Sequence, residues 1–108
     1  MASGVISSIS FSVPNAGRVV LTCSFTVSTV NGDWNGNTTT QTFWAADGGA
    51  PTFGTAIETG ATSNRQSMDL VFNVTAGTTI AAGIYGRVNG ASAATWSKIL
   101  VSYVMLKK

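Results

Sequence analysis

Apolar residues recur at every second position along most of this sequence, and this period of two constrains the fold more than any other feature. Between residues 18 and 27, Val, Leu, Cys, Phe and Val occupy the odd positions, while polar side chains fill most of the even ones. Residues 66–74 show the same alternation, with Met68, Leu70 and Phe72 as apolar residues. Because successive side chains of a β-strand point to opposite faces, both segments predict strands with one buried face.

Further strands are predicted where apolar and β-branched residues lie between clusters of Gly, Pro, Asn and Asp. They cover residues 5–13, 39–45, 53–58, 80–88, 91–96 and 98–106. Asn89-Gly90 supplies the two positive φ angles of a type I′ turn, so we expect a hairpin between residues 80–88 and 91–96. Short strands at this spacing, with no helical periodicity, predict an all-β sandwich or barrel.

The C-terminal segment is apolar on both faces of its expected strand. Such a strand is usual in the centre of a sheet, or where the outer face of a sheet meets another subunit. Trp96, at the start of the segment, is also expected in the core or at a subunit interface rather than at a ligand. The candidate oligomer-interface residues are Val101, Tyr103, Met105 and Trp96. The first three of these alternate along the chain with Leu100, Val104 and Leu106.

Charge is scarce: 9% of the 108 residues are charged, against a typical value of about 25%. Solubility must then come from small polar side chains, from a surface hidden in an oligomer, or from both. The net charge of +2 is scattered, so nucleic-acid binding is not expected. No apolar run approaches the length that crosses a bilayer, and residues 1–6 do not resemble a signal peptide, so we expect neither membrane insertion nor export.

Catalytic residue types are also few. The chain has no histidine and four carboxylates, and its one cysteine, Cys23, lies on the apolar side of a predicted strand. We expect Cys23 to be a small buried side chain rather than a nucleophile, because no histidine can activate it. A glycan hydrolase would need two carboxylates to approach in space, and nothing in the sequence brings them together. We therefore expect no enzyme activity and no cofactor.

The segment "VNGDWNGNTTTQ", residues 30–41, is the best candidate for recognition. Asp33, Asn35 and Asn37 match the first three ligand positions of an EF-hand loop, but the sixth position is not glycine and the twelfth is not a carboxylate. We therefore predict no metal site here. Asn, Asp and Gly favour an ordinary turn. An exposed Trp34 flanked by amides could instead stack on a sugar ring, which makes Trp34, Asp33, Asn35 and Asn37 candidate ligand-binding residues.

The C-terminal sequence "LVFNVTAGTTIAAGIYGRVNGASAATWSKILVSYVMLKK" resembles the end of the small jelly-roll domains of bacteriophage virion proteins. These are similar in architecture to the tumour necrosis factor and complement globular-head family. The earlier stretch "GRVVLTCSFTV" looks like a strand that opens the core of such domains. The resemblance implies an antiparallel two-sheet jelly-roll sandwich, and we expect one such domain over residues 1–108. Independently of the resemblance, the sequence leaves open whether residues 1–4 are disordered or non-native. The resemblance also implies a homotrimer.

Two functions are consistent with this resemblance. We expect a non-enzymatic virion structural protein, a trimeric capsid decoration or accessory protein that is made in the host cytoplasm and contacts other virion proteins. The alternative is a host carbohydrate- or receptor-binding module of a tail or fibre that reads a surface glycan through Trp34.

Overall fold

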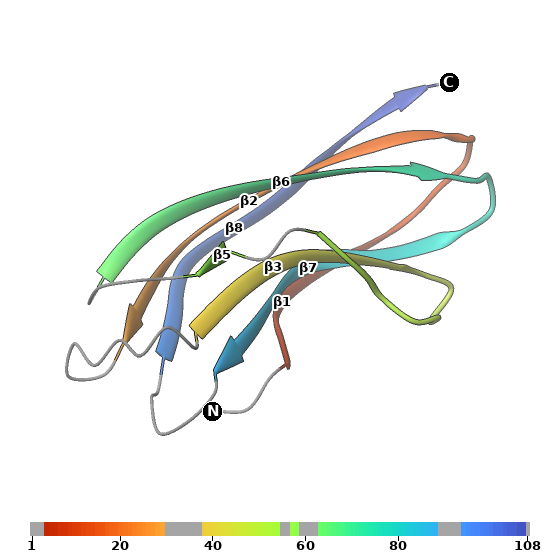
Figure 1. Ribbon diagram of the computed structural model, residues 1–108. Coiled ribbons are helices and arrows are strands. Elements are labelled where there is room, and N and C mark those ends of the chain that lie inside the picture. Colours follow the sequence, from red (N-terminus) through yellow and green to blue (C-terminus); the bar gives the residue numbers. More distant parts are fainter. Residues whose placement is uncertain (1–3, 30–37, 55–56, 59–62, 89–93, 108) are drawn as a thin grey trace.

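The computed structural model describes residues 4–29, 38–54, 57–58, 63–88 and 94–107, which form strands and connecting turns without a helix (Figure 1). The period-two prediction of an all-β chain is therefore confirmed. The strands are β1 (Gly4–Ser12), β2 (Gly17–Thr29), β3 (Thr38–Ala46), β4 (Thr52–Phe53), β5 (Ile57–Glu58), β6 (Ser63–Val74), β7 (Thr79–Val88) and β8 (Ala94–Lys107).

The strands form two antiparallel sheets that lie one over the other (Figure 1). One has the order β1-β7-β3-β4, with β5 also paired to β3, and the other has the order β6-β2-β8. We call the second the three-stranded sheet. This arrangement confirms the predicted antiparallel two-sheet sandwich.

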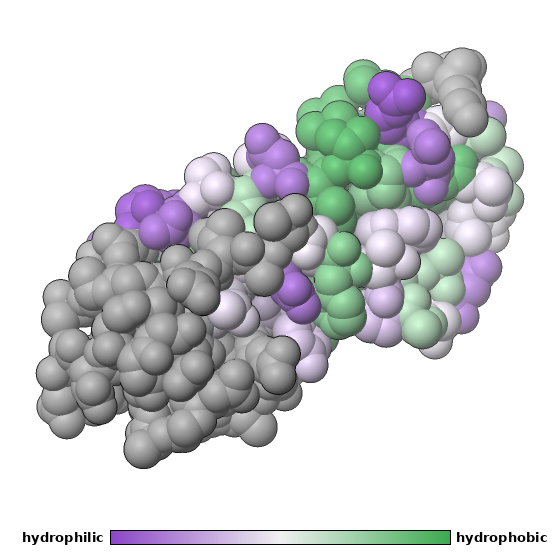
Figure 2. All heavy atoms as spheres, in the orientation of Figure 1, coloured by the Kyte–Doolittle hydropathy of each residue, from purple (hydrophilic) through white to green (hydrophobic). Residues whose placement is uncertain are grey.

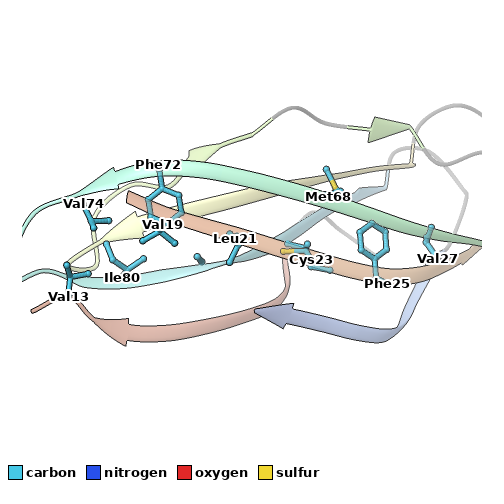
Figure 3. Close-up of a cluster of buried hydrophobic side chains, with 12 residues drawn as sticks. Val13, Val19, Leu21, Cys23, Phe25, Val27, Met68, Phe72, Val74 and Ile80 are labelled. Carbon is cyan, nitrogen blue, oxygen red and sulfur yellow. The ribbon is translucent and has the colours of Figure 1, made fainter. Parts of the chain in front are cut away.

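The core lies between the two sheets, and the central strand β2 supplies its largest share (Figure 3). The inward side chains of β2 are fully buried: Val19, Leu21, Cys23, Phe25 and Val27. Across the three-stranded sheet, β6 adds Met68, Phe72 and Val74, and the opposite sheet adds Ile80, Ala82 and Ile84. The alternation of apolar and polar residues in β2 and β6 is therefore confirmed as inward and outward faces.

The segment between β3 and β6 differs from its prediction. One strand was expected over residues 53–58, whereas the structure has two short strands, β4 and β5, which both pair with β3. Between β3 and β4, Asp47 and Gly48 both have positive φ, 51° and 73°, and the Gly49 amide donates to the Ala46 carbonyl at 2.9 Å. These are the features of a type I′ turn.

The predicted hairpin at Asn89-Gly90 is wrong, because its two strands belong to different sheets. β7 is paired on one side with β1 and on the other with β3, so it has no free edge for β8. β8 pairs with β2 instead. Residues 89–93 lie outside the described residues. Turn chemistry alone therefore gave the right break between strands but the wrong partner.

β8 is one strand interrupted by a bulge, where the sequence predicted two segments. Its register against β2 shifts between Ser24 and Thr26, and Lys98 there has a φ of 51°. The guanidinium of Arg65, on β6, donates to the Lys98 carbonyl at 2.6 Å and to the hydroxyls of Ser24 and Thr26 at 3.1 and 3.3 Å. One side chain thus ties all three strands of the sheet together at the bulge.

A substitution at Gly83, on β7, tests how closely β1 and β7 pack. β1 has a register shift between Val5 and Ser7, and a Cβ on Gly83 would collide with the backbone of Ser7 and Ser8. Because backbone atoms cannot move aside cheaply, we expect Gly83→Ala to lower the free energy of unfolding by about 1–3 kcal/mol in urea titrations. Gly4→Ala is the control, since nothing lies within 4 Å of its added Cβ. Equal stability of the two variants would contradict the close approach.

Candidate functional site

The predicted recognition loop falls outside the described residues. Asp33, Trp34, Asn35 and Asn37 all lie in the range 30–37. The turn and the sugar platform therefore stay predictions, and so does the absence of a metal in this loop.

The interface candidates on β8 lie on its inward face. Val101, Tyr103 and Met105 are opposite the buried β2 residues Cys23, Leu21 and Val19, which fixes the direction in which they point. Val101 and Met105 pack against the core. Tyr103 is 40% exposed, and its ring stacks on Phe11 of β1 with centroids 3.8 Å apart. These side chains close one side of the sandwich, and the opposite face of β8 is the more exposed one.

Trp96 links the two sheets from its place on β8. Its indole Nε1 donates to the hydroxyl of Thr40 on β3 at 2.8 Å, and Thr40 is fully buried. A Cβ on Gly86 of β7 would lie 2.8 Å from the Trp96 ring, so the missing side chain of Gly86 makes room for the indole. This confirms the expected contribution of Trp96 to the core and leaves the interface prediction untested.

Four of the seven large apolar side chains that are exposed in the described part of the chain lie on the outward face of the three-stranded sheet, and Val5, Phe53 and Tyr103 lie elsewhere. Figure 2 shows hydrophobic surface in the region where β2, β6 and β8 run together in Figure 1, with hydrophilic side chains beside it. Val71 is 55% exposed, Val104 59% and Leu100 62%. We call this face the apolar outer face. Its contiguous part is Val20, Val71, Val104 and Leu106, with Arg18 beside Leu106, and Leu100 lies beyond the polar residues Asp69, Thr22 and Ser102.

Sequence reasoning noted the outward residues of β8 but missed Val20 and Val71. Each sits among polar residues on the outward side of its strand, and one such residue means little by itself. The sequence does contain one signal for this surface, which is that several predicted strands each carry an apolar residue at an outward position. Only the register shows that Val71, Val20 and Val104 are direct neighbours.

Side chains with chemical reactivity are dispersed in the described part of the chain. No group of three or more His, Cys, Asp or Glu side chains comes together there. The Asp47 carboxylate joins the β3–β4 turn to the start of β7, since its Oδ1 accepts a hydrogen bond from the Thr79 amide at 2.9 Å. Cys23 is buried as predicted, and burial, with a smaller contribution from the Asp69 carboxylate, raises the pKa of its thiol to about 11.

A shallow depression of about 210 Å³ lies beside the turn between β1 and β2. Pro14, Asn15, Ala16 and Met105 line it. Pockets for drug-sized ligands enclose roughly 300–1,000 Å³ and bury most of the ligand. The depression is therefore too small and too open for such a ligand.

No protein-family model matches this sequence, and no curated protein matches it significantly. The described ranges contain no helix long and apolar enough to cross a membrane. The function of this chain must therefore be inferred from its own surfaces.

Trp96 predicts a measurable coupling between the sheets. Trp96→Phe removes the indole donor and leaves the buried Thr40 hydroxyl without it, so we expect a loss of about 1–3 kcal/mol in unfolding free energy. Thr40→Val is the matched variant, and adding Trp96→Phe to it should cost less than Trp96→Phe alone. Urea titrations of the four proteins measure this. Fully additive effects would show that the hydrogen bond contributes nothing.

We predict that the thiol of Cys23 reacts slowly with labelling reagents. Because its pKa is raised, the folded chain holds little thiolate at pH 8, and burial blocks the reagent. We expect labelling by a disulfide reagent at pH 8 to be at least about 100-fold slower than in denaturant. The raised pKa of the folded thiol also makes the free energy of unfolding depend on pH. This free energy should fall as the pH rises from about 9 to about 11, because in that range the thiol ionises in the unfolded chain but stays protonated in the folded one. Labelling equally fast with and without denaturant would contradict the burial.

Proposed function

We propose that this chain is a non-enzymatic structural subunit of a bacteriophage virion, a capsid decoration or accessory protein that stabilises the particle and associates with itself. The observation that carries the proposal is the apolar outer face. Single exposed apolar residues are ordinary, but a contiguous group spanning several strands is typical of a surface that another protein covers.

The low charge of the chain supports the same proposal. Interfaces are depleted of charged residues at their centres, and only 9% of this chain is charged. Asp47 accepts a hydrogen bond from the Thr79 amide and Asp69 projects from the outward side of β6, so these two carboxylates do not form the paired acid and base of a hydrolase. A role through surfaces accounts for these features better than a role in catalysis.

The jelly-roll form of the sandwich belongs to this proposal. The chain passes from one sheet to the other between β1 and β2, between β2 and β3, between β5 and β6, between β6 and β7, and between β7 and β8. Repeated crossings between two packed sheets are what jelly rolls use. The threefold symmetry comes from the resemblance alone, and the native mass tests it.

Removal of the protein from particles tests the function. We expect stripped particles to lose infectivity at a lower temperature, and re-addition of purified protein to restore the original value, because the subunit stabilises by covering the shell. Adsorption to host cells should stay unchanged.

The alternative hypothesis, a module that binds a host glycan, predicts the opposite effects on heat resistance and adsorption. Stripped particles would then keep their heat resistance and lose adsorption, and Trp34→Ala would abolish glycan binding without changing the native mass. Trp44→Phe is the matched control, since Trp44 lies inside the sandwich and stacks on Phe72, with the two ring centroids 4.6 Å apart. Loss of adsorption with unchanged heat resistance would overturn the structural role.

A further inference from the structure

The apolar outer face has an internal order that indicates what covers it. The pairing of β2 with β6 and β8 places Val71, Val20 and Val104 in one row across the sheet. The next row on one side contains Arg18, and the next row on the other side contains Asp69. An apolar centre is thus flanked by one positive and one negative charge.

This order complements itself under a two-fold rotation. A two-fold axis that runs across the strands at the level of Val20 lays the valine row of one copy over the valine row of another. It also exchanges the two flanking rows, so Arg18 of one copy approaches Asp69 of the other copy. A threefold axis along the strands would instead bring like rows together and set Arg18 residues against one another.

The position of the axis limits how much of the face a second copy covers. β2, β6 and β8 all end at the level of Gly17, so the two-fold rotation overlays only residues 17–23 of β2 and the residues paired with them. Seven residues at roughly 3.3 Å each, on three strands roughly 4.8 Å apart, give an overlap of about 330 Å² in projection. The two overlaid areas together bury about 660 Å², below the roughly 1,200 Å² of a standard interface, so this contact is a weak one that depends on the valine row and on the charge pairing. Tight packing of a second twisted sheet on such a face is an ordinary arrangement.

We propose that two copies of this chain pair face to face through the apolar outer face, with Arg18 of each copy beside Asp69 of the other. Because it specifies a self-contact of the proposed virion subunit, this inference rests on the proposed function. A two-fold contact makes dimers by itself. If a threefold contact exists elsewhere on the chain, it joins trimers in pairs, so the assembly contains an even number of copies.

Charge reversal tests the contact. Arg18→Asp and Asp69→Arg each place like charges together, and we expect either variant alone to associate at least about 10-fold more weakly than the original chain in sedimentation equilibrium. An equimolar mixture of the two variants should associate again, because every pair then has opposite charges. Both side chains are exposed, so the variants should fold, and thermal melting checks this.

Matched controls place the same new charges away from the face. Ser10, on β1 in the other sheet, is exposed. Ser10→Asp and Ser10→Arg should leave the association constant unchanged. Val104→Ser should weaken association without reversing any charge, since it removes an apolar side chain from the central row.

Several results would overturn the inference. These are a monomeric original chain, an odd number of copies, single reversals that still associate normally, or a mixture that fails to associate. A monomer that binds virions through this face would identify another virion protein as the occupant, and the structural role would survive. Conversely, a pair that forms as described but never binds particles would leave the contact standing and overturn the virion function.

Discussion

The buried inward row of β2 is the interaction on which the rest of the sandwich depends. Its five side chains are fully withdrawn from water, and full burial of a side chain such as Phe25 contributes about 1.5–3 kcal/mol. β2 also pairs with a strand on each side, so one segment joins the three-stranded sheet laterally and holds the other sheet across the core. The positions of the turns and of the outer face follow from this strand.

The sequence predicted the strands well because their signal is local. Alternation in residues 18–27 and 66–74 follows directly from the geometry of a strand with one wet face, and both segments form strands that extend beyond those limits. The partner of each strand is a different matter. The expected hairpin at Asn89-Gly90 failed because β7 has β1 and β3 on its two sides, which no feature of residues 80–96 could reveal.

The candidate surface was only half predictable for a related reason. The two apolar faces of β8 are visible in the sequence, but which of them points outward depends on its register with β2. Val101 and Met105 turned inward against the core, while Val104 joined Val20 and Val71 outside. The sum of several unremarkable outward residues becomes a surface only when three strands lie side by side.

The bulge at Lys98 bears on how such a protein avoids uncontrolled growth. β8 is the last strand of its sheet, and a long flat edge invites further strands to add without limit, as in fibres. The extra residue, fixed by Arg65, bends that edge and interrupts the regular ladder on which an incoming strand would form. Contact between faces closes after two copies, whereas addition at edges does not. The bulge therefore makes this edge a poor template for further strands.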